Sequence, residues 1–397
     1  MSADLSALFR RHLCQTSAMP MGLVVHSARG SILRDADGNA WLDLLAGMGV
    51  ANIGHGHPEV LAALRAQAER HLHVMVYGEL VQEAQVRLAA RLAALCPPPL
   101  DVVYFTNSGA EAVDGALKTA RKHTGRRRFV AFENGFHGDT WGALSVGGNP
   151  AYRAPFEPLL PEIVFLPFDD PGALEAIDTT VAAVIVEPIQ AEGGVRIPAP
   201  SFLPALRARC SAVGALLVFD EVVTAFGRTG RLFAAEHWGV VPDLLVLAKA
   251  LGGGLPLGAF VGSAEVMATL AHDPPLAHVT TFGGHPLSCA AGLAALEVLL
   301  RERLAERAAI LGATMRAQLA ACIGRGDLVD VRGAGLLLGL EFASPAACAR
   351  FVARAWERRL ILNWTLHRDT TVRLAPPLVL GEDEAARALE GLDAALG

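Results

Sequence analysis

Lys249 is the residue of this sequence that is best placed to take part in a chemical reaction. It follows an apolar run at residues 244–248 and precedes glycines at 252–254. This pattern predicts a buried strand that ends in an amine. Desolvation at such a strand end disfavours the ammonium form, lowers the pKa of the amine and favours its attack on an aldehyde. The glycines would let the backbone approach a flat ligand closely. Taken alone, a lysine that reaches solvent from a strand end explains the same pattern.

A carboxylate is expected at the same edge of the sheet. A second apolar run, residues 215–219, ends in Asp220, 29 residues before Lys249. That interval accommodates a crossover between two parallel strands, which would bring both side chains to one edge. Pyridoxal phosphate requires this pair: a lysine that holds its aldehyde as a Schiff base and an acid that keeps its ring nitrogen protonated. An aspartate at a strand end is also a common turn former or helix cap.

A third segment predicts a phosphate site. The apolar run at 102–105 leads through Ser108, Gly109 and Ala110 into a helical pattern. Free backbone N–H groups and the positive end of a helix would converge there beside a hydroxyl. Ser108 and Glu111 also have the spacing of a capping box, so an ordinary helix cap is the alternative.

Seven segments together resemble the class III pyridoxal-phosphate aminotransferases, the group of the ornithine, acetylornithine, 4-aminobutyrate and diaminopelargonate enzymes. They occur in the family's order between about residues 30 and 378: TNSGAEAV from Thr106, FHGDTWGALSVGG from Phe136, VEPIQAEGGV from Val186, FDEVVTAFGRTG from Phe219, AKALGGGLPLGA from Ala248, TTFGGHPLSCAAG from Thr280 and VRLAPPL from Val372. The resemblance implies an α/β fold of type I, with a mostly parallel seven-stranded sheet flanked by helices and a smaller α+β domain built from both termini. We expect residues 1–50 to belong to the small domain, 51–288 to form the large cofactor domain and 289–397 to form the small C-terminal domain.

The resemblance also assigns roles. Lys249 and Asp220 become the catalytic residues on pyridoxal 5'-phosphate, and Arg373 binds a substrate carboxylate. Thr281 would reach the cofactor phosphate of a neighbouring subunit, so the family implies a homodimer with a shared active site. The other implied contacts are Ser108, Gly109, Ala110, Phe136, His137, Glu187 and Val222 to the cofactor, and Glu192 and Tyr77 to the substrate.

Two positions depart from the family pattern. Asp139 stands where ornithine-type relatives carry arginine, although the diaminopelargonate enzymes share HGDT. Val223 stands where many relatives have a glutamine that bonds the phenolic oxygen of the cofactor, which valine cannot do. The donor is therefore open among ornithine, acetylornithine, other ω-amino acids and diamines, and 2-oxoglutarate is the acceptor that the family implies.

Three other functions compete with amino transfer. An amino-acid racemase or epimerase on the same scaffold would use Lys249 with a second base. A non-catalytic cofactor-binding protein would not need the lysine, the aspartate and Arg373 together. An NAD-dependent enzyme is disfavoured because the third glycine position after Gly47 and Gly49 holds Asn52.

Composition limits the partners. The chain has 397 residues, 52% of them hydrophobic, and a net charge of −6 without a polybasic stretch, which argues against nucleic acid and anionic membranes as partners. No apolar run reaches about 18 residues, the minimum for a membrane span, and six scattered cysteines predict a reduced, cytoplasmic protein. The pairs His55/His57 and His71/His73 lack further ligands, so we expect no metal. A single long helix is expected over about residues 289–311.

Overall fold

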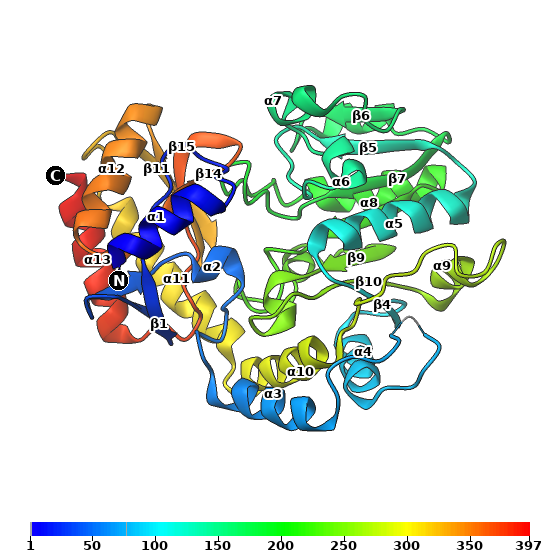
Figure 1. Ribbon diagram of the computed structural model, residues 1–397. Helices are drawn as coiled ribbons and strands as arrows, with labels where there is room; N and C mark the ends of the chain where they lie inside the picture. The colour runs from blue at the N-terminus through cyan, green and yellow to red at the C-terminus, as the bar shows by residue number, and fades with distance from the viewer. Residues whose placement is uncertain (1, 77) are drawn as a thin grey trace.

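A seven-stranded sheet forms the centre of the larger part of the molecule (Figure 1). The computed structural model describes residues 2–76 and 78–397. Every neighbouring pair of strands is parallel except the two pairs made by β10, which are antiparallel. The predicted, mostly parallel seven-stranded sheet is therefore confirmed. In spatial order the strands are β4 (Val102–Thr106), β10 (Gly258–Gly262), β9 (Leu244–Leu247), β8 (Leu216–Asp220), β7 (Val181–Val186), β5 (Arg128–Phe132) and β6 (Ile163–Leu166).

Both faces of this sheet are buried, which explains why its strands are continuous apolar runs rather than alternating patterns. In β7 all six side chains are buried. Ala183 and Ile185 enter the core that includes residues of α5 (Gly109–Thr124), whereas Val184 and Val186 enter the core that includes α8 (Phe202–Val213). Successive side chains of a strand point to opposite faces, so one apolar strand contributes to two cores.

The other helices cover the sheet and connect it to the second part of the chain. α10 packs against α3 and α4 below the sheet in Figure 1. None of the described helices is long and apolar enough to cross a membrane. The remaining helices are α1 (Ser2–His12), α2 (Ala46–Gly49), α3 (Pro58–Arg70), α4 (Glu83–Leu95), α6 (Trp141–Ser145), α7 (Pro150–Arg153), α9 (Ala264–Ala268), α10 (Pro286–Arg301), α11 (Leu304–Ala320), α12 (Pro345–Glu357) and α13 (Glu382–Leu396), with short 3-10 helices at Ala154–Phe156, Pro171–Ala176, Ala234–His237, Lys249–Gly252 and Thr269–Ala271.

Two four-stranded sheets form the smaller part, which draws on both ends of the chain. β13 (Leu360–Ile361) pairs in parallel with β3 (Ala40–Asp43), so the N-terminal hairpin is completed by a C-terminal strand. This mixed origin of the smaller α+β part is as predicted, while the domain limits at 50 and 288 stay predictions. The first sheet has the order β1 (Val25–Arg29), β2 (Ile32–Asp35), β3, β13, and the second has the order β11 (Leu328–Ala334), β12 (Leu337–Phe342), β15 (Arg368–Leu374), β14 (Asn363–Thr365).

The expected long helix at residues 289–311 is wrong. α10 ends at Arg301 and α11 begins at Leu304, separated by Arg303 with a φ of 51°. This left-handed conformation is uncommon for a residue with a side chain. The run is rich in alanine and leucine and contains no proline near the break, so local propensity gave no stop signal.

Candidate active site

The predicted site residues converge on a cavity of about 410 Å³ beyond the carboxyl ends of the parallel strands. Open α/β sheets bind ligands at this edge, and the volume suits a small molecule. Ten predicted residues line the cavity: Ser108, Gly109, Ala110, Phe136, His137, Glu187, Glu192, Asp220, Val222 and Lys249. Val50, Asn107 and Leu257 also line it and were not predicted. Asn107 lies within the TNSG segment, so its position next to Ser108 was the available signal.

Lys249 and Asp220 come from adjacent parallel strands, as predicted. β8 and β9 pair with Asp220 opposite Val246, and β9 ends at Leu247, two residues before the lysine. Lys249 itself has a φ of 49° and starts a single 3-10 turn. Burial lowers the pKa of its amine, and this effect outweighs the opposing attraction of Asp220 and Glu192. A lowered pKa gives a larger fraction of the nucleophilic, uncharged amine at neutral pH.

The three glycines after Lys249 differ in their surroundings. Of the three, Gly254 lines the cavity, and the close approach of a flat ligand stays a prediction there. Gly253 adopts a φ of 59° against α10, where a Cβ would lie 2.6 Å from the carbonyl oxygen of Ala291. A Cβ on Gly292 of α10 would in turn lie 2.3 Å from the carbonyl oxygen of Leu251. Gly253 and Gly292 therefore serve the close packing of α10 on the lysine-bearing turn.

Asp220 is held in place from both sides. Its Oδ1 accepts from the N–H of Val222 at 3.0 Å, and its Oδ2 lies 2.7 Å from Nδ1 of His137. Both side chains are almost completely buried. Burial disfavours a charged imidazole, but the hydrogen bond and the charge of Asp220 raise the pKa of His137 overall. The aspartate is thus oriented and kept next to a positively charged or hydrogen-donating partner. The sequence predicted His137 near the cofactor but did not predict its bond to Asp220.

The proposed phosphate end of the cavity lies where β4 runs into α5. Ser108 is the N-cap, and its Oγ accepts from the N–H of Glu111 at 3.2 Å. The Glu111 carboxylate bonds the N–H of Asn107 at 2.9 Å instead of returning to Ser108, so only half of the capping box forms. The first N–H groups of a helix have no intrahelical partner and point toward an anion placed there.

Glu187 fixes the aromatic wall of the cavity. Its two oxygens accept from the N–H groups of Phe136 and Ala191, at 2.9 and 3.0 Å. Burial raises the pKa of this carboxyl to about 7. Phe136 thereby has a fixed backbone, as a side chain that contacts the face of a planar ring requires.

Arg373, on β15, forms an ion pair with Glu192. The two side chains are 3% and 9% exposed, and the guanidinium also contacts Sδ of Met48 at 3.4 Å. Burial would raise the pKa of Glu192, but the charge and hydrogen bond of Arg373 lower it. Nε of Arg373 is buried without a hydrogen-bond partner among the described residues. One N–H of the guanidinium is therefore enclosed by the described part of the protein without an acceptor.

Three predicted contacts are not part of the described lining of this cavity. Arg373 is connected to it through its ion pair with Glu192, which does line it. Thr281 is exposed and is not part of the cavity lining of its own chain, although the neighbouring Thr280 accepts from Nδ2 of Asn107 at 3.0 Å. Tyr77 lies outside the described residues.

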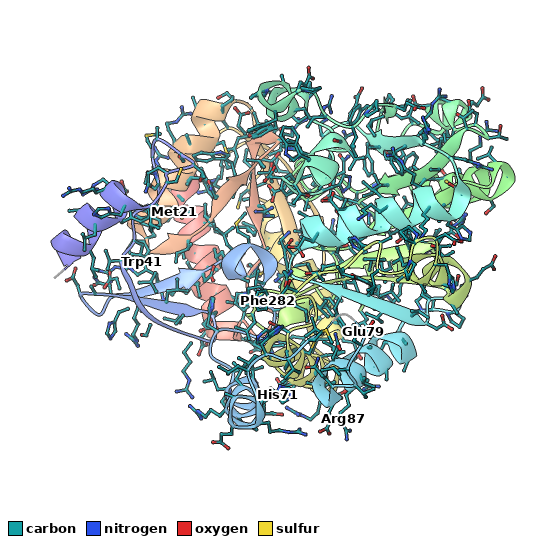
Figure 2. The ribbon with its side chains drawn as sticks, turned by 45° about the vertical axis from the view of Figure 1, so that its right-hand side comes forward. Met21, Trp41, His71, Glu79, Arg87 and Phe282 are labelled. Atoms are coloured by element: carbon teal, nitrogen blue, oxygen red, sulfur yellow. The ribbon has the colours of Figure 1, made fainter. Side chains whose placement is uncertain are left out.

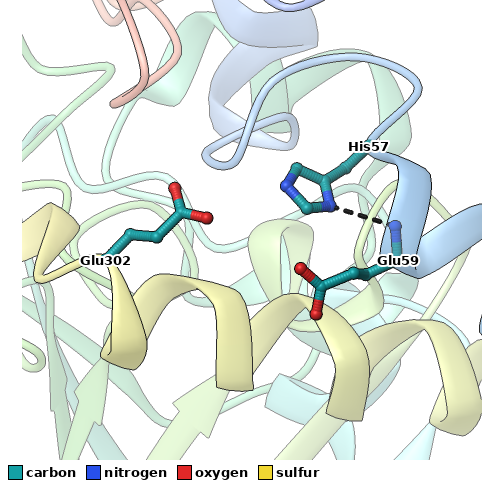
Figure 3. Close-up of side chains that lie close together, drawn as sticks. All are labelled: His57, Glu59 and Glu302. Atoms are coloured by element: carbon teal, nitrogen blue, oxygen red, sulfur yellow. Dashed lines mark hydrogen bonds between the residues drawn. The ribbon is translucent and has the colours of Figure 1, made fainter.

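A group of possible metal ligands lies away from this cavity. His57, Glu59 and Glu302 have ligand atoms within 4.8 Å of one another (Figure 3). However, Glu59 accepts two hydrogen bonds from Arg301, at 2.9 and 2.6 Å, and Arg301 also reaches Glu302 at 3.3 Å. Because both carboxylates are already paired with this guanidinium, the group is explained as a surface ion-pair network.

Comparisons with known proteins agree with this geometry. A family model described as Aminotransferase class-III matches residues 14–396. The chain belongs to the class III aminotransferases. This aminotransferase is 42% identical to the acetylornithine aminotransferase of Methanosarcina acetivorans, over 94% of this chain and 91% of the relative. It is 43% identical to the putrescine aminotransferase of Pectobacterium atrosepticum, over 94% and 82%.

A solved structure of the ornithine aminotransferase of Toxoplasma gondii, with pyridoxal phosphate partially occupying its active site, superposes with a TM-score of 0.93 at 35% identity. The match covers 100% of this aminotransferase and 94% of that chain. The aminotransferase is therefore a pyridoxal-phosphate enzyme that transfers amino groups. The relatives give no support to the racemase alternative.

The cavity of this aminotransferase fits the cofactor. A Cβ on Gly109 would lie 3.0 Å from Val222, and a Cβ on Gly258 would lie 2.2 Å from the carbonyl oxygen of Ser108. Glycine at both positions keeps the helix N-terminus close to the sheet and open at the end where a phosphate would bind. The amine of Lys249 and the carboxylate of Asp220 lie in the same cavity, as an aldehyde and a ring nitrogen require.

Proposed function

We propose that this aminotransferase takes the amino group of a primary amine or ω-amino donor and delivers it to 2-oxoglutarate in two half-reactions at the cavity around Lys249. The observation that carries the proposal is the convergence of Lys249, Asp220 and Glu192 on one cavity, with Arg373 held in an ion pair with Glu192. Relatives named for acetylornithine and putrescine support an ω-amino or diamine donor. The acceptor rests on Arg373, because a guanidinium binds a carboxylate through two parallel hydrogen bonds.

Each of these residues would have a separate role in the reaction. Bound pyridoxal 5'-phosphate supplies an aldehyde carbon for the amino group and a ring that accepts electrons. Lys249 would hold the cofactor covalently, and its released amine would carry the proton to and from the substrate carbon. Asp220, oriented by His137, would keep the ring nitrogen protonated. Ser108, Gly109 and Ala110 would hold the phosphate.

Phe136 and Val222 would enclose the ring from its two faces. Glu192 would release Arg373 when a carboxylate substrate binds, since the ion pair occupies the guanidinium in this structure. In place of the glutamine of many relatives, Val223 lines the cavity without a hydrogen-bonding group. No side chain at this position can therefore donate to the phenolic oxygen.

A homodimer completes the proposal. Several large apolar side chains are exposed to solvent, among them Val81 at 92%, Leu72 at 58% and Phe282 at 52% exposure. The rings of His73 and Phe282 lie 4.7 Å apart, so Phe282 lies beside the segment at residues 71–73, of which His71 is labelled together with Phe282 in Figure 2. Exposed apolar side chains that gather at one place are typical of a protein interface. In such a dimer Thr281 would reach the partner's phosphate site.

We also propose a cytoplasmic location. All six cysteines of the sequence lie in the described part of the chain and are free, as a reducing compartment requires.

Lys249→Ala tests the proposed function. Donor amines and 2-oxoglutarate are supplied separately and the absorbance of the bound cofactor is followed. We expect the variant to bind the cofactor without a borohydride-reducible bond to the chain, visible by mass spectrometry, and to lose transfer in both directions by at least about a thousandfold, because it lacks both nucleophile and base. Undiminished transfer by this variant would refute the assignment. Stereoinversion of an amino acid by the wild type without transfer would favour the racemase.

A further inference from the structure

The turn between β14 and β15 is anchored on Glu192, which lines the cavity. The backbone N–H of Leu366 donates to Oε2 of Glu192 at 2.8 Å, and the N–H of His367 donates to the Glu192 carbonyl at 3.0 Å. The hydroxyl of Tyr152 donates to the carbonyl of Leu366 at 2.8 Å. Three hydrogen bonds from two other segments thus fix a turn that belongs to the smaller part of the molecule.

The tautomer of His367 follows from its partner. Nδ1 lies 3.0 Å from the carbonyl oxygen of Asn134, which can only accept, so Nδ1 carries the hydrogen. Burial lowers the pKa of this imidazole, which keeps the ring neutral at pH 7. Nε2 therefore has a free lone pair. It stays accessible and has no partner among residues 2–76 and 78–397.

The His367 ring lies directly behind a residue that lines the cavity. The His367 ring packs edge-on against Phe136 with 5.6 Å between centroids, and Phe136 lines the cavity. Tyr152 closes the other side at 5.0 Å. A ligand that extends from Lys249 past Phe136 toward solvent passes this group of rings.

The charges around the turn favour a cation. Besides burial, three carboxylates raise the pKa of Tyr152: Glu192, Asp369 and Asp139. Glu192 is neutralised by Arg373, while Asp139 and Asp369 are exposed. Asp139 also acts on His367 and comes two residues after His137, which lines the cavity. An acceptor nitrogen and an unpaired carboxylate suit an ammonium group and repel a carboxylate.

We propose that His367 determines donor specificity: its Nε2 accepts a hydrogen bond from an ammonium group at the far end of the donor, and Asp139 provides the countercharge. The preferred donors are then terminal diamines, ahead of monoamines or ω-amino carboxylates of equal length. This proposal rests on the proposed function, narrows its donor class and names the residues that select the donor.

Two variants separate substrate recognition from a structural role. His367→Asn keeps an N–H at the position of Nδ1, and with it the bond to Asn134, but has no acceptor in place of Nε2. His367→Gln places its carbonyl oxygen near Nε2 and gives up the bond to Asn134. The probes are 1,4-diaminobutane, butylamine and 4-aminobutanoate, each assayed in the donor half-reaction of the holoenzyme.

We expect wild type to prefer the diamine, and His367→Asn to lower kcat/KM for the diamine about tenfold, as for loss of one hydrogen bond to a charged group. Butylamine should be almost unaffected, and His367→Gln should retain most of the preference. If His367 has only a structural role, His367→Gln should lose more activity than His367→Asn, and the loss should be equal for the diamine and butylamine. That outcome overturns the proposal.

Other results also decide the question. If His367→Asn proves unstable by thermal melting, Asp139→Asn replaces it, because this exposed side chain can lose its charge without disturbing the ring. An unchanged ratio of diamine to butylamine in Asp139→Asn would then contradict the proposal. A wild type that reacts only with 4-aminobutanoate overturns the proposal but leaves amino transfer intact, whereas no transfer from any donor refutes the proposed function itself.

Discussion

Replacement of Arg373 by lysine should separate the two half-reactions. The guanidinium is 3% exposed, pairs with Glu192 and has an unpartnered Nε–H within the described part of the chain. Lysine keeps the positive charge, so Glu192 retains a partner. A buried and unpaired Glu192 would destabilise the fold by about 3–5 kcal/mol. Lysine lacks the planar guanidinium that binds a carboxylate through two hydrogen bonds. We expect a cost of about 1.5–3 kcal/mol, or roughly 10–100-fold in kcat/KM for 2-oxoglutarate.

The donor half-reaction provides an internal control. A simple amine such as butylamine has no carboxylate, so its rate in Arg373→Lys should stay within about threefold of wild type, the scatter expected for a contact it does not make. Arg332→Lys is the matched control variant. Arg332 also pairs with a carboxylate, Glu341 at 2.7 Å, but Glu341 does not line the cavity, whereas Glu192, the partner of Arg373, does. Equal losses in both half-reactions, or equal effects of Arg373→Lys and Arg332→Lys on 2-oxoglutarate, would refute the assignment of Arg373 to the acceptor.

Three further predictions concern other contacts. His137→Phe removes the hydrogen-bond donor to Asp220 and should lower kcat of both half-reactions about tenfold, as for loss of one charge-assisted hydrogen bond. His137→Asn should recover part of this loss. Equal kcat in wild type and His137→Phe would contradict the role given to His137. Burial would raise the pKa of Glu341, but hydrogen bonds from neighbouring arginine and threonine side chains lower it from 4.5 to about 2. The ionised carboxylate therefore stabilises the fold above pH 4.5, and this contribution is lost as the pH falls toward 2. Glu341→Gln should be less stable than wild type at pH 7 by about 2 kcal/mol and less sensitive to acid in denaturant titrations. Phe282→Asp should produce monomers in sedimentation experiments and abolish transfer, while Ile310→Asp, at a more exposed site on α11, should not. A dimeric and active Phe282→Asp would exclude this surface as the interface.

The sequence was most informative where one short segment determines one feature. The strand that ends before Lys249 and the strand that ends in Asp220 were predictable because continuous apolar runs are typical of parallel strands. Ser108 and its neighbours were predictable because a strand that leads directly into a helix exposes N–H groups. In each case the chemistry depends on local backbone geometry.

Features that depend on contacts between distant segments were not predictable. The bond between His137 and Asp220 joins residues 83 positions apart, and the anchoring of Leu366 on Glu192 joins residues 174 apart. Gly253 was misinterpreted for the same reason, since its partner is a carbonyl of α10. The break at Arg303 has no local signal, because tertiary packing overrides the helical propensity of the alanine- and leucine-rich run.

The pairing of charges explains why Lys249 has a lowered pKa although three carboxylates lie near it. Asp220 accepts from His137 and Val222, and Glu192 accepts from Arg373. Glu187 accepts two backbone N–H groups, and its raised pKa of about 7 leaves it partly protonated at neutral pH. Each of these three carboxylates thus has a partner, and their attraction for the ammonium offsets the effect of burial only in part. A substitution that frees one of them should raise the pKa of the lysine and slow its reaction with an aldehyde. His137→Phe and Arg373→Lys differ in this respect, because only the first takes away a partner without replacing its hydrogen bond.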